Sequence, residues 1–181
     1  MPLSKNTKFF VLLPFIFFIP NIILPIYYNS KLPSKVAIHY NGDGDADNWG
    51  SKSTLIGINV ALSIFSLVMF LLTCLCVLKC PSSMLNIPNR EYWGSSVMRP
   101  ILMEKITPFL SLTFTFVEII DFFMFFIVFR SNVHDSKKLE GFWVFYVLLT
   151  LFVVSIISLS FRVRKSFSKT HADPLIDKGE W

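Results

Sequence analysis

The chain alternates between long apolar blocks and shorter polar connections. Four blocks, 9–28, 55–78, 108–129 and 142–161, are mainly apolar, and none of them contains a lysine or arginine. A helix needs about 20 residues to cross about 30 Å of hydrocarbon. Only a segment whose backbone groups are all paired can cross it. The pattern therefore predicts an all-α membrane protein, built as a bundle of four transmembrane helices.

The connections between these blocks predict the rest of the organisation. An outer loop covers 29–54, an inner loop covers 79–107, a short outer loop covers 130–141, and a tail follows 162. We expect residues 1–107 to form a first helical hairpin with both long loops, and residues 108–181 to form a second helical hairpin with a cytoplasmic tail. Because proline removes a backbone donor, Pro14, Pro20 and Pro25 predict a bend or partial unwinding of the first helix.

The charge distribution assigns sides to these connections. Of the 181 residues, 53% are hydrophobic and 16% charged, and the net charge is +5. Basic residues flank the apolar blocks, where they orient a membrane protein and meet anionic lipid, so we expect no binding to nucleic acid. An amino terminus on the inner side places eleven basic residues inside and six outside, which predicts both termini in the cytoplasm and a multi-pass protein of the cell membrane. The inner set is Lys5, Lys8, Lys79, Arg90, Arg99, Lys105, Arg162, Arg164, Lys165, Lys169 and Lys178, and the outer set is Lys31, Lys35, Lys52, Arg130, Lys137 and Lys138.

The outer loop is rich in residues that form tight turns, among them Asn41 and Gly44. Asp43, Asp45 and Asp47 at alternate positions resemble part of a calcium loop, but Asn48 and Thr54 stand where its glycine and glutamate belong. We therefore expect no metal, with these aspartates as weak candidates, and a turn lying on the membrane surface. The recognition or structural residues of this loop are His39, Tyr40, Asn41, Gly44, Asp47, Trp49 and Lys52. For His39 we expect a structural hydrogen bond.

The inner loop contains an aromatic segment beside a basic residue. Its candidate residues are Asn86, Pro88, Asn89, Arg90, Glu91, Tyr92 and Trp93. Aromatic rings and a guanidinium are typical of a segment that lies among lipid headgroups. The same residues also fit a docking surface for a cytoplasmic partner, and both interpretations stand.

The third apolar block carries two carboxylates near the predicted bilayer centre. Glu118 and Asp121 share a helix face at a spacing of three residues. Acids at this depth should face the bundle or water rather than lipid. They predict either a proton or cation relay or hydrogen bonds between helices, with Asn59, Ser63 or Ser66 of the second block as partners.

Two motifs make the chain similar to a known group. Leu32-Pro33, His39-Tyr40-Asn41, Gly44, Asp47 and Trp49-Gly50-Ser51-Lys52 form the first, and Asn86 through Trp93 form the second. Together they resemble a bacterial family of multi-pass membrane proteins of unknown function. The amino-terminal region of that family also occurs in immunity proteins against the sporulation-delaying peptide toxin. The resemblance implies an inner-membrane protein that binds a peptide or a regulatory protein.

The function expected first is therefore that of a non-enzymatic integral membrane protein, acting in peptide-toxin immunity or in signalling through partner binding. The alternative is a small transporter or channel component with a relay at Glu118 and Asp121. No serine, cysteine or metal constellation has catalytic spacing, so we expect neither an enzyme nor a cofactor. The expected partners are the lipid bilayer and a peptide or regulatory protein.

Overall fold

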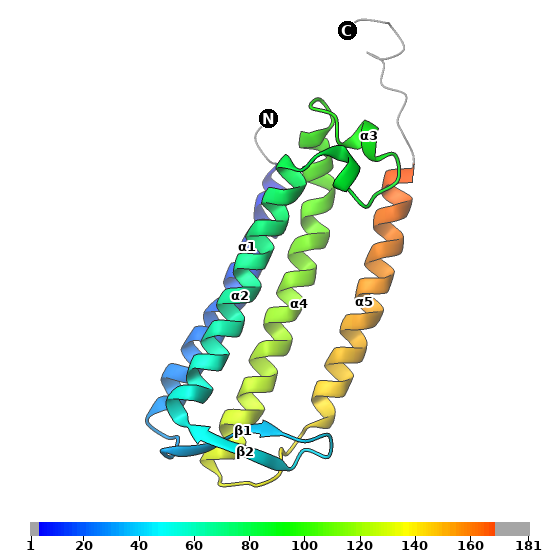
Figure 1. Ribbon diagram of the computed structural model, residues 1–181. Helices are drawn as coiled ribbons and strands as arrows, with labels where there is room; N and C mark the ends of the chain where they lie inside the picture. The colour runs from blue at the N-terminus through cyan, green and yellow to red at the C-terminus, as the bar shows by residue number, and fades with distance from the viewer. Residues whose placement is uncertain (1–3, 169–181) are drawn as a thin grey trace, which may run out of the picture.

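The computed structural model describes residues 4–168 and contains the four predicted long helices (Figure 1). They are α1 (Lys5–Asn29), α2 (Lys52–Lys79), α4 (Arg99–Val133) and α5 (Trp143–Ser168), and each is long and apolar enough to cross a membrane. Large apolar side chains point outward along them, as at Phe161, which is 70% exposed. A surface of this kind is stable against lipid rather than against water. These are the features of a multi-pass membrane protein.

The predicted start of the third helix at 108 is wrong, because α4 begins nine residues earlier, at Arg99. Pro100 lies in the first turn of α4, where a missing backbone donor costs nothing. Leu102 and Met103 then bury the added turns. The predicted boundary between two halves at 107 consequently falls inside one continuous helix.

Helix α1 is continuous through Pro14, Pro20 and Pro25, so the predicted partial unwinding does not occur. The Ser4 side chain caps this helix by accepting a hydrogen bond from the Thr7 backbone N–H at 3.2 Å. Pro14 and Pro25 are buried against the neighbouring helices.

The outer loop contains a β-hairpin that the sequence analysis did not predict. Strands β1 (Lys35–Tyr40) and β2 (Ala46–Ser51) pair antiparallel, with Lys35 opposite Ser51 and an irregular register around His39. Val36 and Ala37, both in β1, are buried. The loop is therefore a small folded layer across one end of the bundle (Figure 1).

The opposite end of the bundle holds both ends of the described chain. There the first turn of α1 meets the first turns of α4, and the inner loop, with the short helices η1 (Ser82–Met84) and α3 (Arg90–Trp93), meets the last turn of α5. We call this the terminal end and the other the hairpin end. The basic residues predicted inside and outside lie at the terminal and hairpin ends respectively, except Lys169 and Lys178, which lie outside the described residues.

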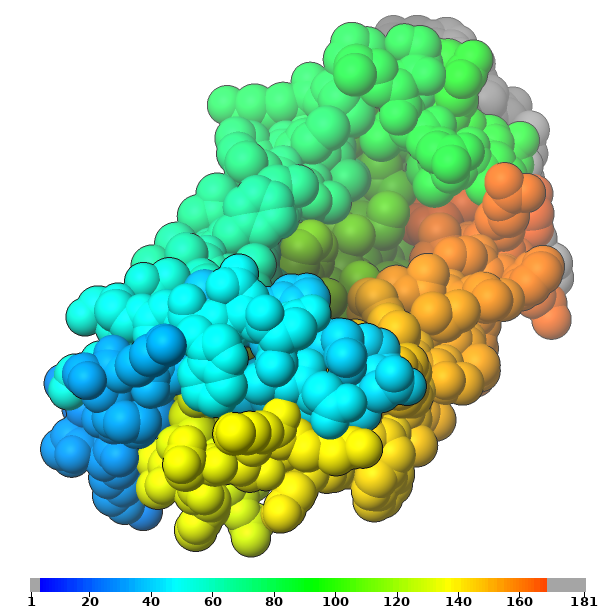
Figure 2. All heavy atoms as spheres, turned by 60° about the horizontal axis from the view of Figure 1, so that its bottom comes forward, coloured from blue at the N-terminus to red at the C-terminus, as the bar shows by residue number. Residues whose placement is uncertain are grey.

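The four helices do not pack equally. Helices α1, α2 and α4 form a close three-helix unit, whereas α5 packs mainly against α4 (Figure 1). Figure 2 shows α4 recessed between α2 and α5, so this side of the molecule is hollowed. The candidate site lies inside the three-helix unit and along this hollow.

Candidate functional site

A line of buried polar side chains runs along the face of α4 that packs against α1 and α2. Thr107, Ser111, Thr115 and Glu118 follow one another at spacings of four, four and three residues, which places them on one helix face. All four are buried. We call them the polar seam; it extends from near the terminal end to the middle of the apolar part of α4.

The polar seam is under-satisfied within the described part of the chain. The hydroxyl oxygens of Thr107, Ser111 and Thr115 have no hydrogen-bond partner there, and neither do the two side-chain amide atoms of Asn59. A buried polar atom without a partner is costly, and most such atoms in proteins bind a protein group or an ordered water. The described residues therefore leave the hydrogen-bonding capacity of this seam unfilled.

Glu118 is the last residue of the seam, at the middle of α4, and it is fully buried. Its Oε2 accepts a hydrogen bond from Asn21 Nδ2 of α1 at 2.8 Å, and the same Nδ2 donates to the Glu118 backbone carbonyl at 2.9 Å. Among the described residues, Glu118 Oε1 has no partner that meets hydrogen-bond geometry, and the Ser66 hydroxyl of α2 lies beside this carboxyl. The sequence analysis missed Asn21. A lone asparagine between prolines in an apolar block was the signal.

Asp121 belongs to a different interface from Glu118. The Ser63 hydroxyl of α2 donates to Asp121 Oδ2 at 2.6 Å, so one of the predicted contacts between the second and third apolar blocks is present. Asn59, also predicted as a partner, makes no side-chain hydrogen bond among the described residues. The two acids share a stretch of α4, but one faces α1 and the other faces α2 and the hollow side of the bundle.

A third carboxylate, missed by the sequence analysis, lies at the terminal end of the same helix. Glu104 Oε1 accepts a hydrogen bond from the Ser4 backbone N–H at 2.6 Å, and its Oε2 accepts from the hydroxyls of Ser4 and Thr7. Glu104 precedes Thr107 by three residues, so it lies where the polar seam begins. Because the predicted inner loop extends to residue 107, Glu104 was assigned to a loop, and its place on the same helix as Thr107 was not predicted.

The other half of the interface, toward the hairpin end, is aromatic and closed. The ring of Tyr28 stacks on Phe129 with centroids 5.4 Å apart, and Phe125 lies against Phe129 at 5.9 Å. These rings form one buried cluster with Leu55 and Val36. Among the described residues, the polar seam ends at Glu118 and does not continue toward the hairpin. Its polar side chains therefore reach Glu118 from the terminal end only.

Asn132 of α4 anchors the hairpin. Its Oδ1 accepts a hydrogen bond from the Ala37 N–H at 2.6 Å, and its Nδ2 donates to the Ala37 carbonyl at 3.1 Å and to the Tyr40 hydroxyl at 3.3 Å. The amide thus pairs with the edge of β1 as a neighbouring strand would. Burial raises the pKa of Tyr40 above its usual value, and hydrogen bonds with Ser131 and Asn132 oppose that rise.

The remaining outer-loop candidates organise the hairpin. Asn41 Oδ1 accepts from the backbone N–H groups of Asp43 and Asp45, and Gly44 has the positive φ of +80° that the turn requires. Lys52 Nζ donates to the Asn29 carbonyl at the end of α1 at 3.0 Å. These residues therefore have structural roles.

Two outer-loop candidates remain exposed. The predicted structural hydrogen bond of His39 is made to Asp47, with Nδ1 and Oδ1 2.5 Å apart, and Trp49 is 37% exposed. Asp45 instead faces Lys138 at 4.0 Å. Asp43, Asp45 and Asp47 therefore diverge, and residues 4–168 contain no group of three potential metal ligands.

Trp93 of the inner loop's aromatic segment is buried against α5. Trp93 is 0% exposed; its Nε1 donates to the Phe167 carbonyl at 3.0 Å, and its ring meets the Phe167 ring edge-on at 5.1 Å. Asn89 Nδ2 donates to the carbonyls of Phe167 and Ser168. Since a helix leaves its last carbonyls unpaired, Asn89 and Trp93 cap α5.

The other inner-loop candidates lie around this cap. Arg90 Nη1 donates to the Ser83 carbonyl at 3.1 Å, and Glu91 accepts from the Ser82 hydroxyl. Tyr92 meets Trp93 edge-on at 5.0 Å. A shallow surface hollow next to this cap includes Asn86. Pro88 is half-buried in the turn before α3. The segment as a whole holds the terminal end together.

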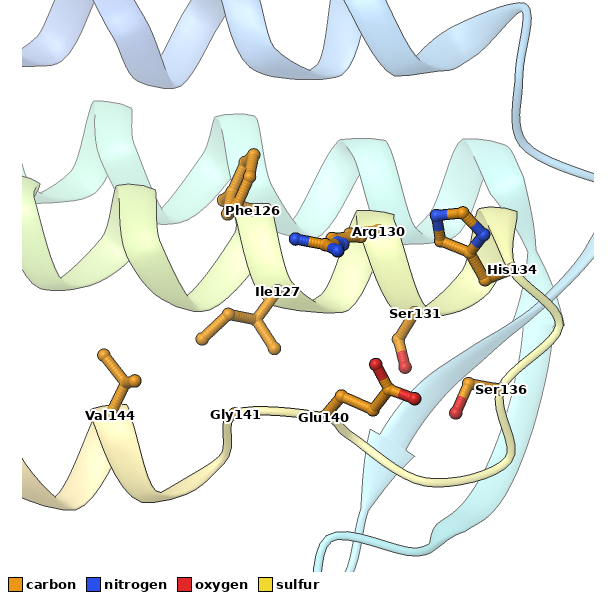
Figure 3. A pocket seen from close by; sticks show the side chains of 9 residues that line it. All are labelled: Phe126, Ile127, Arg130, Ser131, His134, Ser136, Glu140, Gly141 and Val144. Atoms are coloured by element: carbon orange, nitrogen blue, oxygen red, sulfur yellow. The ribbon is translucent and has the colours of Figure 1, made fainter.

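Among the cavities that flank α4, two reach the hairpin end. The larger, about 490 Å³, lies between α2, α4 and α5 beneath β1, and its lining includes Asp121, His39 and Tyr40. We call it the lateral groove. The smaller, about 300 Å³, lies at the hairpin end. Its lining includes Arg130 of α4, His134 just after α4, and Glu140 of the loop before α5 (Figure 3). Of the two, only the lateral groove reaches an acid at membrane depth.

Comparisons with known proteins agree with this picture at the coarse level. The family model described as Domain of unknown function (DUF1648) matches residues 15–64, from the middle of α1 through the hairpin to the first half of α2. No curated protein and no solved structure matches the chain. The matched segment and the four apolar helices fit an integral membrane protein of unknown function. The segment includes Asn21, Asn59 and Ser63, the partners and neighbours that α1 and α2 bring to the acids of α4.

Proposed function

We propose that the protein is a non-enzymatic membrane protein that moves protons across the membrane, from an entrance at its terminal end through the acids at the middle of α4. The observation that carries this proposal is the buried carboxyl of Glu118, which ends the polar seam at the middle of α4. Among the described residues, its Oε1 and the hydroxyls of the seam have no hydrogen-bond partner. Ionisable residues at membrane depth commonly belong to proton relays. Glu104 at the terminal end gives the relay its entrance.

The divergence of the acids favours a proton over a metal cation. A hard cation needs about six oxygen ligands around one point, whereas Glu118 pairs with Asn21 and Asp121 pairs with Ser63 in separate interfaces. A proton needs only a chain of groups that can both accept and donate. Carboxyls and hydroxyls are such groups.

The orientation is part of the same proposal. The terminal end carries most of the basic residues, and such residues favour the cytoplasmic side. We therefore propose that both termini are cytoplasmic, that the membrane is the cell membrane, and that the relay opens toward the cytoplasm. The aromatic cluster of Tyr28, Phe125 and Phe129 then lies between the acids and the outer side, so protons cross the membrane only when this cluster opens.

The test is proton flux in proteoliposomes that hold a pH-sensitive dye, driven by an imposed potassium diffusion potential. The wild type should carry protons faster than vesicles without protein, and Glu118→Gln should lower the rate at least tenfold. Glu140→Gln, which neutralises an exposed carboxylate at the hairpin end, is the matched control and should keep the rate. Equal rates for wild type and Glu118→Gln would refute the relay.

A second candidate function is recognition of a peptide or regulatory protein, including the toxin immunity that the resemblance implies. The observation that favours it is the hairpin, because β1 is anchored by Asn132 while β2 presents Asp47 and Trp49 to solvent. A rigid exposed strand can bind a partner. This role does not use the carboxyls, so neutralising Glu118 and Asp121 together would abolish proton flux and leave partner binding intact.

A further inference from the structure

The lateral groove has a composition that neither proposed role explains. Apolar side chains from α2, α4 and α5 line it, including Leu62, Leu149 and Phe152, and Asp121 is its only carboxylate among the described residues. The other titratable groups that line the groove are His39 and Tyr40 at the hairpin end, and α2 and α5 contribute only apolar residues to its lining. Its volume, about 490 Å³, is within the range of sites that bind drug-sized molecules.

We infer that this groove binds a lipophilic monocation, an aromatic or alkyl amine or a quaternary analogue, with its positive charge against the carboxylate of Asp121. The inference deepens the proposed function and rests on it, since Asp121 would carry either a proton or the charge of the ligand. The apolar body of the ligand would fill the groove, whose lining includes the rings of Phe125, Phe142, Phe145 and Phe152, and aromatic rings attract cations.

Charge complementarity selects this occupant over two others. A lipid acyl chain would leave the carboxylate of Asp121 without a counter-charge in apolar surroundings. A second copy of the chain has no cation to offer at this depth, because the apolar blocks 9–28, 55–78, 108–129 and 142–161 contain no lysine or arginine. An amine brings both the apolar surface and the charge.

The test uses two ions of nearly equal size and shape and opposite charge. Saturable binding of radiolabelled tetraphenylphosphonium to the detergent-solubilised protein is measured by equilibrium dialysis beside that of tetraphenylborate. The wild type should bind the cation at least tenfold more tightly than the anion. Asp121→Asn should weaken cation binding at least tenfold. Equal binding of the two ions, or equal binding by wild type and Asp121→Asn, would overturn the inference.

A second pair of variants separates the groove from general effects on the fold. Leu149→Trp fills the groove from α5 without touching the acid, and it should weaken binding at least tenfold. Leu151→Trp makes the same change two residues away, where the helix faces away from the groove, and should stay within twofold of wild type. If Leu149→Trp instead dissociates a dimer on size-exclusion chromatography and leaves binding unchanged, the groove is a contact between copies and the inference fails.

The two proposals can fail separately. Glu118-dependent proton flux without saturable binding of tetraphenylphosphonium would keep the relay and overturn the ligand assignment. Asp121-dependent binding without Glu118-dependent flux would keep the ligand site and overturn the proposed function.

Discussion

The two halves of the interface between α1 and α4 differ in chemistry although the same two helices form both. Toward the hairpin end, Tyr28, Phe125 and Phe129 stack in a closed cluster, and the polar anchor Asn132 has partners for both of its amide atoms. Toward the terminal end, Thr107 and Ser111 are equally buried but have unpartnered hydroxyls. A protein tolerates unpaired groups where they serve a function and compensates elsewhere. Under the proposed function, the aromatic half stabilises the fold and the polar half carries the proton movement.

The sharpest test of this comparison is the removal of the central ring of the aromatic half. Phe129→Ala leaves a cavity among Tyr28, Phe125 and Leu55, and large-to-small changes of this kind cost about 3–5 kcal/mol. Unfolding in mixed micelles with increasing sodium dodecyl sulfate measures the loss. Phe123→Ala is the matched control, since Phe123 lies on the same helix but is 42% exposed, and it should cost much less.

Equal losses for Phe129→Ala and Phe123→Ala would break the comparison at its first step. They would mean that the cluster adds nothing beyond the contacts that any outward-facing ring makes.

A smaller loss is expected when the hairpin anchor is removed. Asn132→Ala leaves the buried N–H and C=O of Ala37 without their side-chain partner, and an orphaned buried group costs about 1–3 kcal/mol. Amide hydrogen exchange followed by mass spectrometry should show faster exchange in β1 and unchanged exchange at the centre of α2. Asn48→Ala, at an exposed position of β2, is the control.

If exchange in β1 stays at the wild-type rate in Asn132→Ala, the hairpin is held by Val36 and its apolar neighbours alone. The anchor would then be a consequence of the fold rather than one of its causes.

The sequence predicted the number and type of the long helices because that information is local. Twenty apolar residues without a charge specify a spanning helix wherever they occur. The hairpin was not predicted, because strand β1 is short and the partner that completes it, Asn132, lies 95 residues along the chain. The turn residues Asn41 and Gly44 were identified correctly, but the residues near them do not show that the segments before and after the turn pair as strands.

The candidate site was predictable in its parts but not in its geometry. Glu118 and Asp121 were expected to act together because they are three residues apart on a helix. The packing of α1 on one side and α2 on the other divides them. Glu104 was hidden because the start of α4 was placed after it. Trp93 is buried by its contact with Phe167 of α5, and the sequence of the inner loop alone does not show that contact.

The smallest effect on stability is expected in the polar half, where the comparison predicts a change in activity without a loss of fold. Ser111→Ala and Thr115→Val each replace an unpartnered buried hydroxyl by an apolar group of similar size. Since no hydrogen bond is lost, each variant should unfold within about 0.5 kcal/mol of wild type or be more stable. Proton flux in the vesicle assay should nevertheless fall, because the line of hydroxyls toward Glu118 is interrupted.

Thr113→Val provides the matched control for this pair. Its hydroxyl lies on the same helix but donates to the Phe109 carbonyl at 2.9 Å, outside the polar seam. Its flux should equal that of wild type. A large destabilisation by Ser111→Ala with unchanged flux would reverse the comparison, because the buried hydroxyls would then stabilise the fold and the path to Glu118 would have to lie elsewhere.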